Sequence, residues 1–163
     1  MSVSFTALEV FEIAEKIEQN GEKFYRQAAE VTSDKSMSRF FGQLAEMEAN
    51  HGKVFAGMKK LIQNDAADVT VFDPDNEIAY YLKAIAVSAG WEGKAMPRIF
   101  FNGKETPEQI LKSAIEAEKA SINYYLGLKE LVSQADKGKV EAIIKEEMGH
   151  VVTLQKHLEQ IKN

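Results

Sequence analysis

Two copies of the pattern Glu-x-x-His are the residues in this 163-residue sequence best suited to chemistry. They are Glu48 with His51, and Glu147 with His150. Residues three apart in an α-helix are neighbours on one face, so each pair can direct a carboxylate and an imidazole at the same point. At 100° per residue, both pairs also fall within stripes of apolar side chains, which predicts that they face a protein core. This placement favours metal ligands over solvated surface residues.

Two further glutamates, Glu18 and Glu118, also fall within apolar stripes, whereas Glu46 and Glu116 point away from them. Four carboxylates aimed at one core would be too costly to bury without cations or protons to compensate their charge. Two divalent metal ions supply that compensation, and oxygen-rich ligands with one histidine per metal suit iron or manganese better than zinc. The predicted ligands of this two-metal site are Glu18, Glu48, His51, Glu118, Glu147 and His150.

These residues also have interpretations that are simpler than a metal site. A single Glu-x-x-His is a weak signal that usually lies on a solvated face, but two such patterns with two core glutamates favour the metal site. The remaining histidine, His157, lacks the pattern and is interpreted as a surface residue or one that complements a helix dipole. Tyr25 and Tyr125 follow Glu18 and Glu118 at the same interval, so they are either ordinary core tyrosines or hydrogen-bond donors to ligating carboxylates.

Four amphipathic segments are expected to position these residues. Thr6 with Glu9, and Thr106 with Gln109, have the spacing of capping boxes that begin helices. A helix of about 25 residues is roughly 38 Å long. Short connections predict two antiparallel hairpins, and the repeated Glu–Tyr and Glu-x-x-His spacings suggest that they are related by a pseudo-two-fold axis. The predicted helices span about 7–31, 35–62, 107–132 and 137–161, and a turn around Ser133–Gly138 is expected between the last two.

The connection over residues 63–106 is much longer than usual and is expected to contain a short helix at about 76–88. A crossover of this length lets the second and third long helices run parallel. The sequence therefore predicts an all-α four-helix bundle with one long crossover, forming a single domain over residues 1–163. Part of the crossover, at 89–103, is too apolar for a free loop, and we expect it to pack on the bundle or on a second subunit. Its apolar residues are Trp91, Pro97, Ile99, Phe100 and Phe101.

Composition narrows the classes of function. The sequence contains no Cys, which excludes disulfides, thiolate metal sites and a thiol nucleophile within these residues. A net charge of −5 and a pI near 5.3 argue against binding to nucleic acid or to an anionic membrane. No apolar run is long enough for a membrane span, and the first residues lack the pattern of a signal peptide. We therefore expect a cytoplasmic protein.

Four stretches of this sequence resemble the ferritin-like di-iron carboxylate superfamily, and within it the rubrerythrins. They are EQNGEKFYRQAA (18–29), LAEMEANH (44–51), AIEAEK (114–119) and KEEMGH (145–150). The resemblance implies two iron ions, with manganese as the other candidate. It also implies that Glu48 and Glu147 bridge the two ions. Glu18 with His51 would complete one ion, and Glu118 with His150 the other.

The sequence departs from the rubrerythrin pattern at three points. Rubrerythrins usually carry a rubredoxin domain with Cys ligands, so a chain without Cys is expected to use an external electron donor, such as a rubredoxin-like protein. Ser121 stands where they tend to have a second glutamate, as in a bacterioferritin-type site. Ala49 stands where bacterioferritin has its haem-ligating Met, so no haem is expected.

The leading functional hypothesis is a rubrerythrin-like non-haem di-iron oxidoreductase that reduces peroxide or dioxygen. The alternatives are a ferroxidase-type protein whose substrate is ferrous ion, and a metal-binding bundle without turnover. The resemblance also implies a homodimer.

Overall fold

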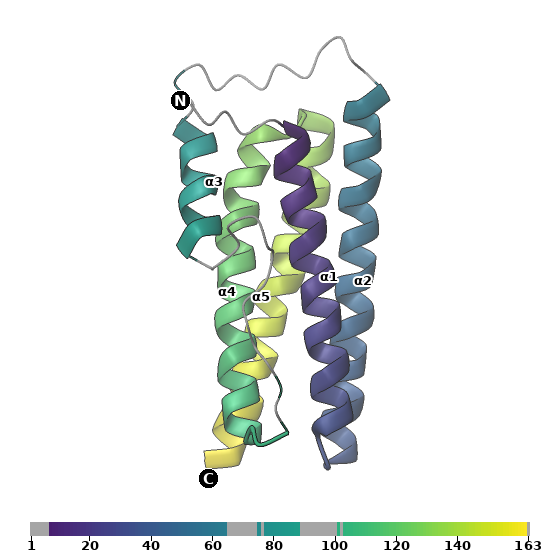
Figure 1. The fold of residues 1–163 in the computed structure, drawn as a ribbon, viewed down its shortest axis with the longest axis vertical. Helices are drawn as coiled ribbons and strands as arrows, with labels where there is room; N and C mark the ends of the chain where they lie inside the picture. The colour runs from purple at the N-terminus through teal and green to yellow at the C-terminus, as the bar shows by residue number, and fades with distance from the viewer. Residues whose placement is uncertain (1–6, 65–74, 76, 89–100, 102, 163) are drawn as a thin grey trace.

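The computed structural model describes residues 7–64, 75, 77–88, 101 and 103–162. Within this part of the chain the secondary structure is entirely helical, which confirms the predicted all-α fold. Figure 1 shows two antiparallel hairpins, α1–α2 and α4–α5, with α2 and α4 running in the same direction. None of the described helices has the length and apolar character needed to cross a membrane. The helices are α1 (Ala7–Val31), α2 (Lys35–Asn64), α3 (Glu77–Ser88), α4 (Pro107–Leu131) and α5 (Gln134–Lys162).

Local side-chain hydrogen bonds set the helix boundaries that could be predicted. The backbone amide of Gln109 donates to the Thr106 hydroxyl over 3.2 Å, and the Thr106 amide donates to the Gln109 side chain over 2.8 Å. This capping box begins α4, as its sequence pattern indicates. At the turn between α1 and α2, the Asp34 carboxylate accepts a hydrogen bond from the Met37 amide over 2.7 Å. The expected cap at Thr6 lies outside the described residues.

The start of the last helix differs from the prediction. Helix α5 begins at Gln134, about one turn earlier than the expected start near residue 137. The carbonyl of Ser133 accepts hydrogen bonds from the amides of Asp136 and Lys137, so the helical pattern is already established there. Gly138, which the sequence interpretation assigned to the turn, lies within the helix instead. A single glycine in an exposed helix is tolerated, and it is therefore a weaker boundary signal than the bonds to Ser133.

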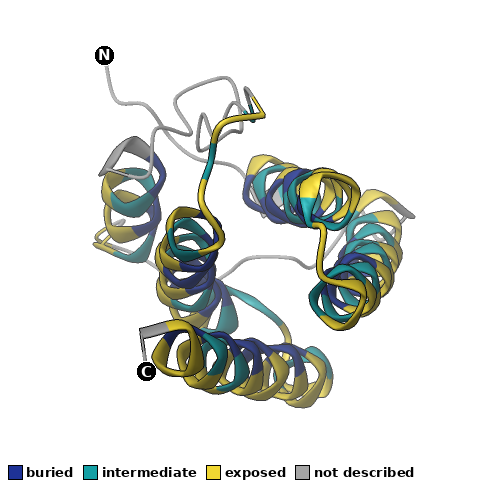
Figure 2. Cartoon of the chain, turned by 90° about the horizontal axis from the view of Figure 1, so that it is seen from below, coloured by how far each residue is buried: buried dark blue, intermediate teal, exposed yellow. Residues whose placement is uncertain are grey.

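The buried residues form two apolar clusters that are separated along the bundle axis. One contains Phe11, Phe55 and Tyr125, and the other contains Tyr25 and Phe41. On each of the four long helices, residues of one cluster come first and residues of the other cluster follow. A short polar stretch lies between the two sets. Figure 2 shows the buried faces of these helices turned towards one another. The bundle therefore has a polar layer across the middle of its apolar core.

The short helix α3 extends the first of these clusters. Leu82 and Ala86 are buried in that cluster, and Gly127 on α4 provides the space that α3 needs. Of the apolar crossover residues, the structure describes Phe101, whose ring packs 5.1 Å from that of Phe24. The contact agrees with packing on the bundle for this residue. The other apolar residues expected to pack there, Trp91, Pro97, Ile99 and Phe100, lie outside the described part of the chain.

The contact between α3 and α4 gives a direct test of this packing. A Cβ atom at Gly127 would lie 2.7 Å from the Tyr81 ring and 2.8 Å from the buried Leu82 side chain. We expect Gly127→Ala to lower the free energy of unfolding by about 1–3 kcal/mol, because the core must be displaced. Gly138→Ala is the matched control, since its Cβ would meet nothing within 4 Å. It should stabilise the helix by about 0.5–1 kcal/mol. Urea denaturation measures both, and equal effects would contradict this packing.

Candidate metal centre

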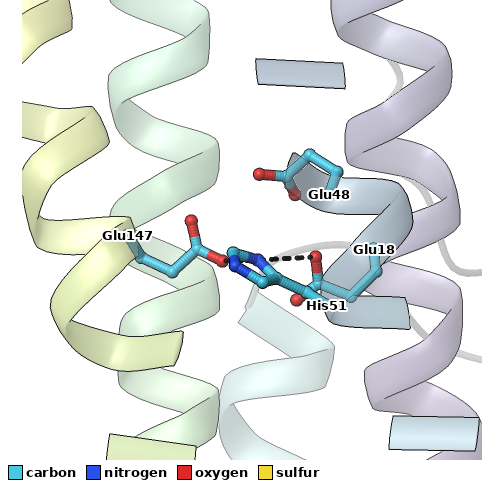
Figure 3. Close-up of side chains that lie close together, drawn as sticks. All are labelled: Glu18, Glu48, His51 and Glu147. Carbon is cyan, nitrogen blue, oxygen red and sulfur yellow. Dashed lines mark ion pairs between the residues drawn. The ribbon is translucent and has the colours of Figure 1, made fainter. Parts of the chain in front are cut away.

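All six predicted ligands lie in the polar layer between the two apolar clusters. Helices α1 and α4 each contribute one glutamate, and α2 and α5 each contribute a glutamate and a histidine. Each of these side chains comes from a stretch flanked by core residues one turn away, which explains why periodicity in the sequence is enough to find them. Figure 3 shows four of them pointing towards one another. The buried residues are Glu18, Glu48, His51, Glu118, Glu147 and His150.

These residues form two overlapping groups whose potential ligand atoms lie within 4.8 Å of one another. Glu18 and His51 belong to the first group, and Glu118 and His150 to the second. Glu48 and Glu147 belong to both. The arrangement is therefore a pair of adjoining sites of four residues each that share two carboxylates from opposite hairpins.

The shared position of Glu147 is visible in its distances. Its Oε1 lies 2.9 Å from Nδ1 of His51, and its Oε2 lies 2.8 Å from Nδ1 of His150. The His51 Nδ1 also lies 3.5 Å from Glu18 Oε2, and the His150 Nδ1 lies 3.4 Å from Glu118 Oε1. Both imidazoles thus direct Nδ1 at the carboxylates, with one oxygen of Glu147 towards each.

The unpaired atoms of the layer fit divalent metal ions. Several buried nitrogen and oxygen atoms have no hydrogen-bond partner among the described residues, and such atoms are costly to bury. They include Nδ1 of both histidines and both oxygens of Glu147, which are close together but not in hydrogen-bond geometry. Imidazole nitrogens and carboxylate oxygens that converge in this way are the donor set of a metal site. Oxygen ligands with one imidazole per site suit iron or manganese.

Two tyrosines connect the hairpins at the edge of this layer. Tyr25 on α1 donates a hydrogen bond to Oε1 of Glu118 on α4, and Tyr125 on α4 donates to Oε1 of Glu18 on α1. The equal spacing of Glu and Tyr in the sequence is therefore expressed as two equivalent bonds. Burial and the neighbouring carboxylates raise the pKa of both phenols well above the usual value, so they remain donors. Both tyrosines are therefore hydrogen-bond donors to predicted ligands, and not ordinary core residues alone.

The ionisation of the layer reflects its burial and its mutual charges. Burial raises the pKa of Glu48, and the three other carboxylates raise it further. Burial likewise raises the pKa of Glu118, to about 8. Burial would lower the pKa of the histidines, but the carboxylates outweigh it and raise that of His51 to about 11 and that of His150 to about 9. Without metal, protons therefore compensate part of the carboxylate charge.

Glu147 behaves differently from the other three carboxylates. Burial alone would raise its pKa, but the interactions with His150 and His51 outweigh this effect and lower the pKa to about 2. Its central position between the two imidazoles is the physical cause. Glu147 is therefore the carboxylate of the layer whose ionised form is favoured, whereas burial raises the pKa of the other three.

Two residues near the centre were not predicted from the sequence. Nε2 of His51 lies 2.8 Å from Oε2 of Glu146, whose side chain is 49% exposed. The helical wheel directs Glu146 outward and the contact crosses from α5 to α2, so the periodicity of the sequence does not indicate it. Gly21 lies so close to Glu48 that a Cβ atom there would be 2.4 Å from Oε2. The available signal was a glycine inside a helix, which usually costs stability and therefore often marks a close approach.

Two other residues lie outside the set of ligand atoms. His157 is half-buried, and its ring packs 4.7 Å from that of Phe40 rather than joining the layer. Ser121 is buried, and its hydroxyl donates to the Ala117 carbonyl over 3.0 Å. Rubrerythrins tend to have an additional glutamate at this position. Here the side chain is a hydroxyl that bonds to the backbone of its own helix, α4.

Comparisons with known proteins agree with this geometry. A crystal structure of a Thermotoga maritima protein, described as a ferritin-like diiron-carboxylate protein, has a TM-score of 0.68 to this chain and 23% sequence identity. The similarity covers 98% of each chain. The fold is ferritin-like. Residues 2–61 of the sequence match the family model of rubrerythrin, which confirms the resemblance found in the sequence. No curated protein matches the chain.

The pKa values predict how pH affects the stability of the metal-free bundle. Glu118 and His150 have raised pKa values in the folded chain, of about 8 and about 9, so the folded state holds protons that the unfolded state releases. This stabilisation is complete at low pH and is lost as the pH rises through those values. We expect the Tm of metal-free protein, measured by circular dichroism, to fall between about pH 6 and pH 9.

Two controls accompany this measurement. Excess Mn²⁺ should abolish the fall, because metal binding displaces the same protons and is favoured at higher pH. Glu118→Gln should reduce the fall in the metal-free protein, since the amide does not titrate. A metal-free protein that is as stable at pH 9 as at pH 6 would contradict the protonated layer.

The close approach of Gly21 to Glu48 predicts a loss of metal affinity without loss of the fold. Gly21→Ala should displace the flexible Glu48 carboxylate and weaken Mn²⁺ binding by roughly tenfold or more, as measured by calorimetry. The metal-free variant should remain folded, because the atom displaced is the end of a side chain. Gly57→Ala is the control, since it makes the same change in a helix with nothing within 4 Å. Equal affinities of the two variants would contradict a role for Gly21.

Proposed function

We propose that this chain is a non-haem di-iron oxidoreductase that reduces hydrogen peroxide, with dioxygen as the other candidate oxidant. The observation that supports it is the pair of overlapping ligand groups, each with one histidine, which share Glu48 and Glu147. Two adjacent ions in such a site can supply two electrons to one substrate. The proposal takes iron as the metal because carboxylate-rich sites with one imidazole per ion suit it, and manganese is the alternative.

The chain's own residues would hold the centre and control access to it. Tyr25 and Tyr125 each orient a carboxylate across the hairpins, which fixes the outer ligands. Glu48 and Glu147 enter from opposite hairpins, and no tyrosine in the described part of the chain donates to them as Tyr25 and Tyr125 donate to the outer glutamates, so we infer that they are the carboxylates able to shift. The apolar clusters on both sides of the layer exclude bulk water from its ends. An outer frame that is fixed and an inner pair that can shift suit a site that changes oxidation state.

The reaction needs reactants that the bundle must receive from outside. Reduction of one hydrogen peroxide to two waters consumes two electrons and two protons. The sequence contains no Cys that could hold an iron–sulfur or rubredoxin-type relay, so we propose an external donor such as a rubredoxin-like protein. We also propose that the chain acts as a homodimer.

A second candidate function is oxidation of ferrous ion as the substrate, as in a ferroxidase-type iron-handling protein. The observation that favours it is Ser121, whose hydroxyl is bonded to the backbone and which therefore adds no carboxylate to the site. The absence of that carboxylate brings the ligand set closer to the bacterioferritin type. The two functions differ in which oxidant reacts fast and in what happens to added iron.

Rapid mixing of the reduced, iron-loaded protein separates these possibilities. We expect peroxide to oxidise the iron at least about tenfold faster than dioxygen, which corresponds to a barrier lower by about 1.4 kcal/mol. Comparable slow oxidation by both would contradict a peroxidase. Continued turnover of added Fe²⁺ with dioxygen, in particles much larger than a dimer, would support the ferroxidase function. Glu147→Ala should lose bound iron, as measured by metal analysis, whereas the exposed Glu116→Ala should retain it.

A further inference from the structure

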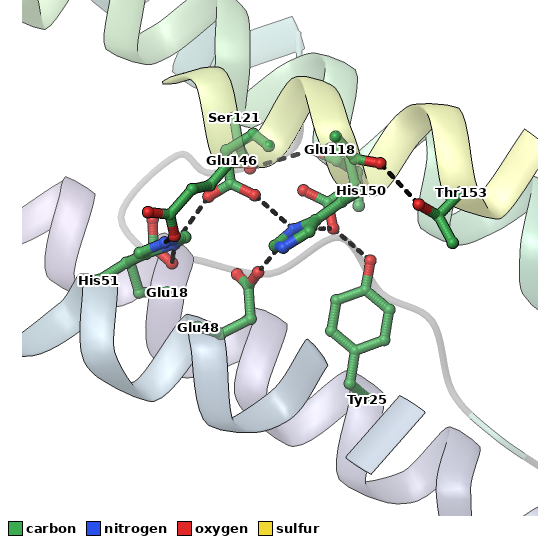
Figure 4. A network of polar contacts seen from close by, with 12 residues as sticks. Glu18, Tyr25, Glu48, His51, Glu118, Ser121, Glu146, His150 and Thr153 are labelled. Atoms are coloured by element: carbon green, nitrogen blue, oxygen red, sulfur yellow. Dashed lines mark hydrogen bonds and ion pairs between the residues drawn. The ribbon is translucent and has the colours of Figure 1, made fainter. Parts of the chain in front are cut away.

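The two histidines of the layer differ in what their outward-facing nitrogens contact. Nε2 of His51 lies 2.8 Å from Oε2 of Glu146. Nε2 of His150 is also buried, but no described residue offers it a hydrogen-bond partner. The two rings are otherwise alike, with centroids 6.2 Å apart and planes 22° from parallel. Figure 4 shows Glu146 beside His51, with the His150 ring nearby.

This difference follows from the sequences of the two hairpins. Glu146 directly precedes Glu147 on α5, and the residue that directly precedes Glu48 on α2 is Met47. Each lies four residues before the histidine of its own helix. A methionine side chain cannot accept a charge-assisted hydrogen bond as a carboxylate does. At the two equivalent positions of the pseudo-two-fold arrangement, Glu146 is therefore a hydrogen-bond acceptor for His51, and Met47 cannot be one for His150.

We propose that Glu146 makes the two metal positions unequal, so that the position of Glu18 and His51 binds a divalent ion more tightly than the position of Glu118 and His150. The inference rests on the proposed metal binding. A carboxylate that accepts a hydrogen bond from Nε2–H fixes the tautomer in which Nδ1 carries the lone pair, and it makes Nδ1 a stronger electron-pair donor to a metal ion. It also adds a negative charge close to one ion. Glu146 acts through His51 and is thus a positioning residue.

The surroundings of the second position agree with an ion that exchanges more readily. A pocket of about 350 Å³ is lined by residues of α2 and α5, among them Gln43, Met47, Glu146, His150 and Thr153. His150 belongs to this lining and His51 does not. The imidazole whose Nε2 has no carboxylate partner among the described residues is therefore the one that lies against the pocket.

Titration of the metal-free protein with Co²⁺ tests the proposal without any turnover. Cobalt absorption and calorimetry should resolve two binding steps of different affinity. Glu146→Gln should weaken the tighter step by about 10- to 100-fold, the usual effect of losing an outer partner of a ligand, and should change the weaker step little. Glu141→Gln is the matched control, because it makes the same change in charge at an exposed position of the same helix. It should leave both steps unchanged.

Three further variants assign the steps and reverse the effect. His51→Ala should remove the tighter step, and His150→Ala the weaker one. Met47→Glu places a carboxylate at the position equivalent to Glu146, so it should strengthen the weaker step and bring the two affinities together. Circular dichroism of each metal-free variant checks that it is folded.

The outcomes distinguish this inference from the proposed function. If the native protein binds no Co²⁺, Mn²⁺ or Fe²⁺, the proposed metal function itself is wrong. If it binds two ions in equal steps, or if Glu146→Gln weakens both steps alike or neither, the inequality is overturned while the metal function stands. Two unequal steps whose ratio is unchanged by Glu146→Gln and by Met47→Glu would show that the inequality comes from repulsion between the ions, and would also overturn the role of Glu146.

Discussion

Burial of four carboxylates in the middle of the bundle is the constraint on which the rest of the structure depends. Glu18 and Glu147 are fully buried, and the layer they belong to separates two apolar clusters that would otherwise be continuous. Such a layer is stable only if protons or cations compensate its charge. The raised pKa values of Glu48, Glu118 and His51 indicate compensation by protons, and the converging nitrogen and oxygen atoms without hydrogen-bond partners fit compensation by metal. The apolar clusters on both sides of the layer hold the helices together whether protons or metal ions compensate the charge.

The arrangement of the helices gives the layer two chemically different sides. Helix α1 packs beside α4, and α2 packs beside α5. The first contact brings together the two Tyr–Glu hydrogen bonds, and the second brings together the two imidazoles. Parallel α2 and α4 are necessary for this pairing, because they place the second hairpin in the orientation that repeats the first. The long connection between α2 and α4 is therefore needed for the geometry of the site as well as for the topology of the bundle.

The helices and the six proposed ligands could be predicted because both depend on the same periodicity. A glutamate that follows the apolar stripe of a long helix must be buried when the helix packs, and this argument needs no knowledge of its neighbours. Glu146 could not be found in this way, because it lies off the stripe and reaches His51 across a helix interface. The close approach of Gly21 to Glu48 likewise depends on the distance between α1 and α2. The start of α5 was misplaced because Gly138 is a local signal that the bonds to Ser133 outweigh.

What distinguishes the two halves of the centre is therefore found beside the ligands rather than in them. The six proposed ligands and the two tyrosines obey the pseudo-two-fold repeat, with equal intervals and equivalent bonds. The adjoining positions do not, since Gly21 corresponds to Ser121, and Met47 corresponds to Glu146. Gly21 leaves room for one shared carboxylate, and Glu146 contacts one of the two imidazoles. A symmetric frame with unequal surroundings would hold two like ions in different environments, although the ligands of the two positions are of the same types.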